Sequence, residues 1–164
     1  MMIREATDAD VPAMTRTLNW AIRETSFIFR TEPATVEERT DHLYQLRRDK
    51  CPCFIACADD GTYLGWALYH PYRDPKVWVG CYDTTIYLDP AAQGRGVGTR
   101  LLDALVSHAR AAENVHTLLA LIVADNVASI KLHEKFGFAS VGTFQEVTRK
   151  AGRWLDLTHL QLMV

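Results

Sequence analysis

Apolar residues in the first part of the chain recur at helical spacing. A short strand over residues 2–6 is followed by a segment with one apolar side. That side consists of Val11, Met14, Leu18 and Ile22. The chain is therefore predicted to open with a strand and an amphipathic helix that packs on a core.

Cap and turn signals place the next three elements. Thr35-Val36-Glu37-Glu38 has the form of a capping box, which predicts a second helix that ends at about Arg48. Asp60-Gly61 is a strong hairpin signal between two strand-like segments, residues 53–58 and 62–69. These signals predict a helix followed by an antiparallel pair of strands.

The second half of the chain alternates between strands and helices. Helices are predicted over residues 98–113 and 127–136, and strands over residues 81–88, 117–124, 138–147 and 154–163. Asn126 suits the N-cap of the later helix, and Gly137 suits the position that follows it. Because three consecutive strands precede the first of these helices, the order predicts a mixed α/β sheet and not a pure βαβ repeat.

Composition restricts the possible functions. Apolar residues make up 48% and charged residues 23% of the 164 residues, as in an ordinary globular protein, and the formal net charge is −2. No basic field favours nucleic acid or a membrane surface as a partner, and no apolar run approaches the ~20 residues that span a bilayer. No internal repeat or linker interrupts the sequence, so residues 1–164 are interpreted as a single domain.

The four cysteines give no sign of a disulfide framework or a metal site. Cys51, Cys53, Cys57 and Cys81 form no Cys-x-x-Cys pair, and no histidine stands at a zinc-site spacing from them. They are interpreted as buried free thiols. With no apolar signal segment at the N-terminus, a cytoplasmic location is expected, and no metal is expected.

A glycine-rich loop is the most informative segment. Gln93-Gly94-Arg95-Gly96-Val97-Gly98 stands between a strand and a helix, where alternate glycines allow a tight turn and expose successive N–H groups. The following helix N-terminus adds partial positive charge, so the loop is suited to phosphate. The loop lacks the Gly-Lys-Ser/Thr of a Walker motif. It also follows the middle of the chain, which argues against a dinucleotide fingerprint.

Two motifs together resemble a known family. Gln93, Gly96 and Gly98 match the pyrophosphate-binding signature of the GNAT acetyltransferases, and residues 126–138 match the second signature, Asn-x-x-Ser through Gly-Phe. The order and separation of the motifs also agree. The resemblance implies the GNAT fold with acetyl-CoA as the donor.

Other segments narrow the resemblance to one branch of that family. The chain is similar to the phosphinothricin and methionine sulfone N-acetyltransferases at residues 29–33, 83–88, 132–134 and 152–156. This resemblance implies an amino-acid-like amine as the acceptor, and a homodimer. The apolar last strand, Leu155 to Val164, is predicted to pack across the two-fold axis.

The resemblance also assigns the residues that bind acetyl-CoA. The backbone of Ile86, Tyr87 and Leu88 is expected to pair with the pantetheine arm like an added strand. Gln93 begins the signature, and the amides that hold the pyrophosphate are those of Gly94, Arg95, Gly96, Val97, Gly98 and Thr99. Asn126 and Ser129 are expected to lie along the pantetheine.

Two residues are the candidates for catalysis. Asp83 stands where the family has a glutamate proposed as the general base, so it is interpreted either as the base or as a group that only orients the amine. His133 stands where many GNAT enzymes have a tyrosine that protonates the departing thiolate. A structural histidine is the alternative for His133.

The acceptor site is expected to include Phe29, Arg73, Asp83, Thr84 and Thr85. Arg73 lies in the loop before the central strand, where it is either a bidentate partner for an acceptor carboxylate or a solvated loop residue. Phe27 and Phe29 are candidates for one wall of this site, with burial in the core as the alternative.

Several other aromatic and histidine side chains are assigned to packing or to the surface. The tryptophans interpreted as packing residues are Trp66, Trp78 and Trp154. The histidines interpreted as surface positions are His42, His108 and His116, and His70 is interpreted as a loop residue or a part of the acceptor site.

Three functions are compatible with these features. The first is an N-acetyltransferase for a small amino-acid-like amine such as phosphinothricin, methionine sulfone or methionine sulfoximine. The second is acetylation of a protein N-terminus or a polyamine by the same fold, and the third is a CoA-binding module without turnover. Asp83 and His133 together favour catalysis.

Overall fold

The computed structural model describes all residues from Met1 to Val164, and it contains one mixed seven-stranded sheet in the order β1-β2-β3-β4-β5-β7-β6. The strands are β1 (Met2–Glu5), β2 (Cys53–Cys57), β3 (Tyr63–Pro71), β4 (Cys81–Leu88), β5 (Thr117–Val123), β6 (Ala139–Lys150) and β7 (Arg153–Met163). The helices are α1 (Val11–Glu24), α2 (Val36–Arg48), α3 (Val97–Ala111) and α4 (Val127–Lys135), with short 3₁₀ turns at η1 (Asp8–Asp10) and η2 (Pro90–Ala92). Every predicted strand and helix is present.

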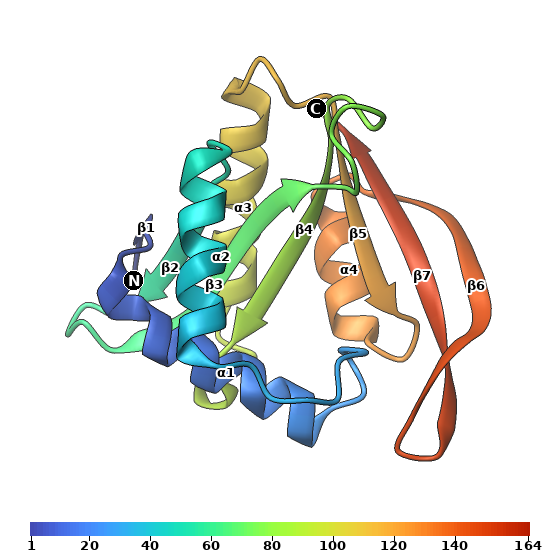
Figure 1. The fold of residues 1–164 in the computed structure, drawn as a ribbon, viewed down its shortest axis with the longest axis horizontal. Coiled ribbons are helices and arrows are strands. Elements are labelled where there is room, and N and C mark those ends of the chain that lie inside the picture. Colours follow the sequence, from blue (N-terminus) through green and yellow to red (C-terminus); the bar gives the residue numbers. More distant parts are fainter.

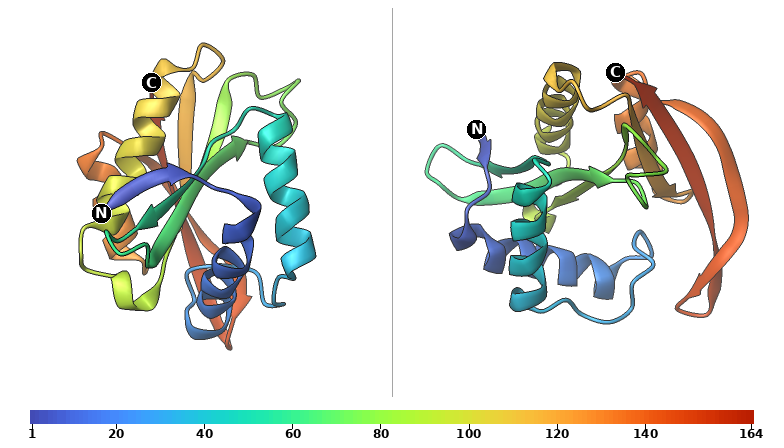
Figure 2. Two further views of the ribbon diagram at one scale, coloured as in Figure 1. Left: turned by 90° about the vertical axis from the view of Figure 1, so that its left-hand side faces the viewer. Right: turned by 45° about the horizontal axis from the view of Figure 1, so that its top comes forward.

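The helices cover both faces of the sheet. Figures 1 and 2 show α1 and α2 on one face and α3 on the other, with α4 beside β5 on the α3 side. The apolar side of α1 is buried as predicted, and Leu101, Leu102 and Leu105 of α3 have no exposed surface. None of the helices is long and apolar enough to cross a membrane.

The start of α2 departs in one respect from the predicted capping box. The Thr35 hydroxyl accepts a hydrogen bond from the Glu38 N–H over 3.0 Å, which caps the helix as expected. The Glu38 carboxylate does not return to the Thr35 backbone. It binds the guanidinium of Arg30 instead, so a charged partner in the preceding loop has replaced the second half of the box.

The two central strands separate after a short contact. β4 and β5 run parallel and pair only at Cys81–Thr117, Tyr82–Leu118 and Asp83–Leu119. The Thr84 hydroxyl then donates to the Leu119 carbonyl over 2.9 Å and closes the junction. Beyond it the strands diverge (Figure 1), so the inner edge of β4 from Thr84 to Leu88 has no strand partner on the β5 side.

The position of the last strand corrects the expected dimer surface. β7 lies between β5 and β6, and its Leu155, Leu160 and Leu162 are buried within the chain. These three leucines are therefore not available to pack across a two-fold axis. Exposed apolar side chains lie on the edge strand β6, at Val141, Phe144 and Val147, and at the two ends of β7, at Trp154 and Met163.

The tryptophans also differ from the prediction. Trp66 is buried as expected, whereas Trp78 and Trp154 are exposed large hydrophobic residues. Trp78 lies in the β3–β4 loop and Trp154 on the β6–β7 hairpin, both outside the core. Spacing alone does not separate these three positions, because only the tertiary arrangement determines which loops and edges are covered.

Candidate active site

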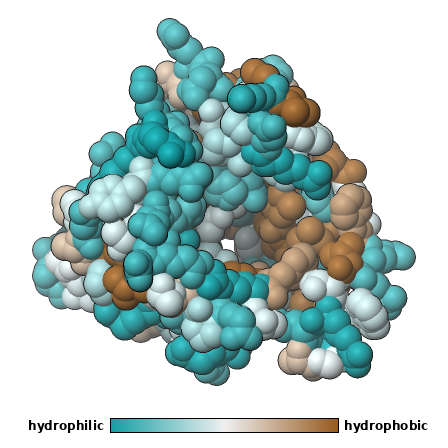
Figure 3. Space-filling view, in the orientation of Figure 1, coloured by the Kyte–Doolittle hydropathy of each residue, from teal (hydrophilic) through white to brown (hydrophobic).

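A cavity of about 600 Å³ opens where β4 and β5 diverge. Its walls come from β4, β5, the glycine-rich loop before α3, helix α4 and the last turn of α1 with the segment that follows it. Figure 3 shows the surface hollowed near the middle of this face, with hydrophobic residues on the side of β5 and β7. The divergence of two paired strands thus creates a through-passage in the middle of the sheet.

Residues of the glycine-rich loop line this cavity. Gly94 and Gly96 have φ values of +72° and +77°, and a Cβ at either position would meet no atom within 4 Å. The backbone therefore requires glycine through its left-handed conformation and not through crowding. The N–H groups from Gly94 to Thr99 make no backbone hydrogen bond, so they are free for an anion at the N-terminus of α3.

Position 98 requires glycine for a different physical reason, which is crowding. A Cβ at Gly98 would lie 3.1 Å from Cδ2 of Leu132 and 3.6 Å from Cδ1 of Leu88. The absence of a side chain lets α3, α4 and β4 approach one another at the bottom of the cavity. At the start of α4, the Asn126 side chain accepts the Ser129 N–H over 3.2 Å, so its carbonyl oxygen serves as the helix cap.

Asp83 is a half-buried residue whose carboxyl has no acidic or basic partner. Its Oδ1 is buried and has no hydrogen-bond partner, and burial raises the pKa of Asp83 to about 7. In the antiparallel register Asp83 lies opposite His70, so both side chains are on the same face of the sheet. His70 lies next to His42 of α2, with ring centroids 6.2 Å apart, so this is the α1/α2 face.

His133 approaches the cavity from the opposite face. It lies on α4 with 3% of its surface exposed, and its ring meets Phe138 edge-on at 5.0 Å between centroids. Nδ1 is 2.8 Å from the Ser129 carbonyl oxygen, which only accepts, so Nδ1 carries the proton. Burial lowers the pKa of His133, which favours a neutral ring whose Nε2 can accept a proton.

The sequence comparisons agree with this geometry. Residues 14–138 match the acetyltransferase (GNAT) family. The chain is 39% identical to a phosphinothricin N-acetyltransferase of Streptomyces coelicolor, over 96% of this chain and 92% of that one. This chain belongs to the GNAT acetyltransferase family. It is also 35% identical to an L-methionine sulfoximine/L-methionine sulfone acetyltransferase of Pseudomonas paraeruginosa, over 98% of this chain and 92% of that one.

Solved GNAT-type structures superpose on the whole chain. An acetyltransferase from Salmonella typhimurium, solved with its cofactor acetyl-CoA, has a TM-score of 0.95 at 32% identity and covers 99% of this chain and 93% of its own. A ribosomal-protein-alanine N-acetyltransferase from Brucella melitensis has a TM-score of 0.95 at 36% identity, over 100% of both chains. The predicted fold and family are therefore confirmed.

Most residues assigned from the GNAT resemblance meet at this cavity. Those that line it are Asp83, Thr84, Thr85, Ile86, Tyr87, Leu88, Gln93, Gly94, Gly96, Val97, Gly98, Thr99, Asn126, Ser129 and His133. Arg95 of the loop, and Phe29 and Arg73 of the expected acceptor site, are not among its lining residues. The roles of these residues stay proposals.

Arg73 and His42 have surroundings that the sequence did not indicate. The Arg73 guanidinium lies 5.2 Å from the Tyr72 ring and 5.8 Å from the Trp78 ring, so it is stacked within its own loop. His42 is half-buried between α2 and β3, and burial lowers its pKa to about 4, so the surface interpretation was wrong. His70 lies at the end of β3 and not in a loop.

Some lining residues were not assigned from the sequence. Trp20 and Thr25 at the end of α1 line the cavity, as does Phe27, which the sequence named as a candidate for its wall. Phe27 is 45% exposed, so the alternative of core burial is wrong for it. Its aromatic side chain in a polar loop was a usable signal. The choice between Phe27 and Phe29 depended on the loop's path, which spacing does not predict.

Proposed function

We propose that this GNAT protein transfers the acetyl group of acetyl-CoA to the primary amine of a small amino-acid-like acceptor. One observation carries the proposal: a single cavity joins the free amides of residues 94–99 to Asp83 and His133. The chain's similarity to acetyltransferases for phosphinothricin and methionine sulfoximine or sulfone supports this acceptor class. Enzymatic turnover, not CoA binding alone, is the function that the family supports.

Different residues along the cavity would bind acetyl-CoA and accept the proton of the amine. The amides of Gly94 to Thr99 would hold the pyrophosphate, and the unpaired edge of β4 offers backbone groups to the pantetheine. When bound, acetyl-CoA supplies a thioester that an amine can attack. Asp83 would accept a proton from the acceptor ammonium, because a carboxyl with a pKa of about 7 is half deprotonated near neutral pH.

The proton on Nδ1 limits the proton transfers that His133 can perform, compared with the donor role that the resemblance implied. With the proton on Nδ1, its Nε2 can only accept, so the residue cannot donate to a departing sulfur until it has first taken up a proton. We infer that His133 receives a proton and passes it on. Because Asp83 and His133 approach from opposite faces of the sheet, the reacting groups would meet between them.

The acceptor end of the cavity favours a small ligand. The segment after α1 lines the cavity through Thr25 and Phe27, and the Lys150 ammonium of the β6–β7 hairpin donates to the Ile28 carbonyl of this segment over 2.9 Å. This contact joins the hairpin to the segment that contains Phe27. An amine at the end of a long polymer would have to reach the cavity by a route that avoids the contact between Lys150 and Ile28.

An acceptor panel tests the proposal. Thiol release from acetyl-CoA is measured with phosphinothricin, methionine sulfone, methionine sulfoximine, a polyamine and a peptide that begins with alanine. We expect at least one of the three amino-acid analogues to give a kcat/KM on the order of 10⁴ M⁻¹s⁻¹ or more, the lower end for enzymes. Release with none of the three contradicts the proposed acceptor class.

The alanine peptide tests a second candidate function. The Brucella melitensis structure that matches the full chain is described as a ribosomal-protein-alanine N-acetyltransferase, which favours a protein N-terminus as the alternative acceptor. A kcat/KM for the peptide above that of every amino-acid analogue would establish this alternative. The Lys150–Ile28 bridge makes the opposite result our expectation.

We also propose a homodimer formed through β6 and a cytoplasmic location. β6 is an edge strand whose Phe144 is 59% exposed, and exposed apolar edges are typical of pairing surfaces. The four cysteines are free and buried, as in proteins of reducing compartments.

The dimer is tested by sedimentation of Phe144→Glu. We expect wild type to sediment as a dimer at micromolar concentration and Phe144→Glu to sediment as a monomer, because a buried unpaired charge opposes association. Val79→Glu is the control, since Val79 is 79% exposed in the β3–β4 loop, away from β6. A monomeric wild type, or a dimer in both variants, contradicts the proposed interface.

A further inference from the structure

The segment from Thr25 to Ala34 forms a wall of the cavity without regular secondary structure. It joins α1 to α2, and Thr25 and Phe27 line the same cavity as Asp83. We call this segment the acceptor wall. The Phe27 side chain is partly exposed and lacks the support of a core, so its position depends on how the acceptor wall is held.

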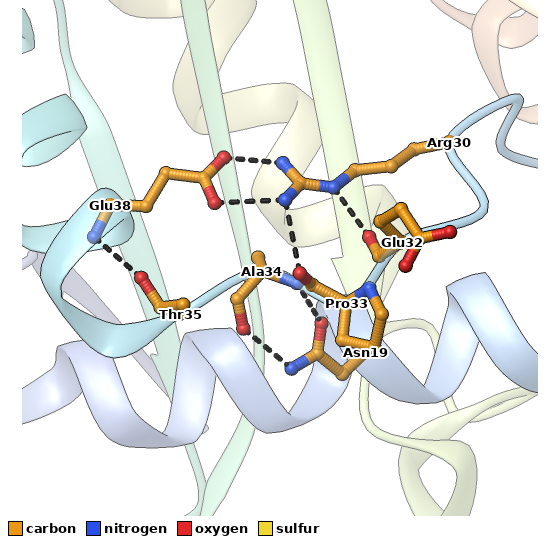
Figure 4. A network of polar contacts seen from close by, with 7 residues as sticks. All are labelled: Asn19, Arg30, Glu32, Pro33, Ala34, Thr35 and Glu38. Carbon is orange, nitrogen blue, oxygen red and sulfur yellow. Dashed lines mark hydrogen bonds and ion pairs between the residues drawn. The ribbon is translucent and has the colours of Figure 1, made fainter.

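Arg30 holds the acceptor wall with one planar group. Its Nε donates to the Glu32 carbonyl over 2.6 Å, and one terminal nitrogen donates to the Pro33 carbonyl over 3.1 Å (Figure 4). That nitrogen also donates to Glu38 Oε2 over 2.8 Å, while the other one binds Glu38 Oε1. The guanidinium therefore connects the loop backbone to the first turn of α2 in a bidentate arrangement.

Two further contacts fasten the acceptor wall. The Asn19 side chain of α1 accepts the Ala34 N–H over 2.7 Å and donates to the Ala34 carbonyl over 2.9 Å (Figure 4). The Lys150 ammonium donates to the Ile28 carbonyl from the β6–β7 hairpin. Arg30 thus lies between these two points of attachment, three residues from Phe27.

The exposure of the Arg30–Glu38 pair indicates a geometric role. The two side chains are 35% and 47% exposed, and ion pairs in contact with water contribute little to folding stability. Their hydrogen bonds to backbone carbonyls still restrict the path of the loop. Loss of Arg30 should therefore change the position of the acceptor wall more than it changes the stability of the fold.

We propose that Arg30 is a positioning residue that sets the place of Phe27 and so determines which acceptor side chains fit the cavity. This proposal rests on the proposed function, because it assumes that the acceptor amine binds beside Asp83. Arg30 itself does not line the cavity and acts through the acceptor wall. Its effect should fall on the acceptor and not on acetyl-CoA, whose candidate amides lie on the loop at 94–99.

The test compares Arg30→Met with Arg47→Met. Arg47 is a matched control because it also joins α2 to a carboxylate and a carbonyl, with 2.6 Å to Asp8 and 3.1 Å to Ala6, away from the cavity. For Arg30→Met we expect KM for the acceptor to rise roughly 10- to 100-fold and the ranking of acceptors to change. KM for acetyl-CoA should stay within about twofold, as small local shifts affect only the ligand they contact.

Two more measurements complete the test. Arg30→Lys keeps the charge but not the bidentate geometry, so we expect an acceptor KM between those of wild type and Arg30→Met. Hydrogen–deuterium exchange of residues 25–34 should be faster in Arg30→Met and unchanged in Arg47→Met. This second readout needs no acceptor, so it remains decisive if wild type fails to acetylate any amine and the proposed function is wrong.

Unchanged exchange of residues 25–34 in Arg30→Met would overturn the proposal. The same holds if the acceptor KM and the ranking of acceptors stay as in wild type, or change equally in Arg47→Met. A loss of kcat with an unchanged acceptor KM would also contradict a positioning role. Faster exchange together with the KM change in Arg30→Met alone supports it.

Discussion

Asp83→Asn is expected to lower turnover on an accepted amine by ~10²–10⁴-fold, the usual cost of losing a positioned base. The amide has nearly the shape of the carboxyl but takes up no proton. Acetyl-CoA affinity should change little, because Asp83 lies on the α1/α2 face and away from the free amides of residues 94–99. Steady-state kinetics with calorimetric binding of acetyl-CoA checks both statements.

The pH dependence of kcat/KM gives a second measure of the same residue. A base works when deprotonated, so the wild-type rate should rise with pH through an apparent pKa near the value of about 7 that burial gives Asp83. This step should disappear in Asp83→Asn. If a step survives at a lower pH, the proton acceptor is His133, whose pKa burial lowers. Asp103→Asn, at an exposed position of α3, is the control.

Asp83 should also make the stability of the fold depend on pH. Stability should fall with rising pH, whereas activity should rise. Its folded-state pKa is raised, so the folded chain holds the proton more tightly than the unfolded chain does. Its contribution to stability is full below about pH 4, the unfolded pKa, and is lost as the pH rises through about 7. Between about pH 4 and 7, the free energy of unfolding should therefore fall less in Asp83→Asn than in wild type. An equal pH dependence in both proteins would contradict the buried, unpaired state of this carboxyl.

Gly96→Asp is expected to weaken acetyl-CoA binding by about 100-fold, because it places a negative charge among amides suited to phosphate. The site has room for the side chain, since a Cβ at Gly96 meets no atom within 4 Å. Aspartate also tolerates the left-handed backbone better than most residues. The folded protein should therefore survive the substitution. Calorimetric titration with acetyl-CoA measures the loss.

Gly96→Asn separates charge from backbone strain. Asparagine makes the same demand on the φ of +77° and carries no charge, so its acetyl-CoA affinity should stay within about tenfold of wild type. The difference between the two variants should shrink at high salt, as expected for a screened interaction with a phosphate. Equal affinity in Gly96→Asp and wild type would exclude this loop as the pyrophosphate site.

The sequence determined the elements and much of the cavity. Helical spacing from Val11 to Ile22, the Asp60-Gly61 turn and the Thr35 and Asn126 caps are local signals, and local signals survive folding. The glycines at 94, 96 and 98 predicted an anion-binding turn, because an unusual backbone conformation requires that residue type. The family followed from two motifs in order, and the comparisons confirmed it.

Only the tertiary structure decided how distant parts of the chain meet. The insertion of β7 between β5 and β6 buried Leu155, Leu160 and Leu162 and left apolar side chains of β6 exposed, because strand order depends on pairing partners and not on local spacing. The path of the acceptor wall brought Phe27 and not Phe29 to the cavity, and Arg30 of this wall contacts a helix that begins six residues later. The raised pKa of Asp83 likewise comes from burial, which depends on how distant segments of the chain pack against β4 and not on any single stretch of sequence.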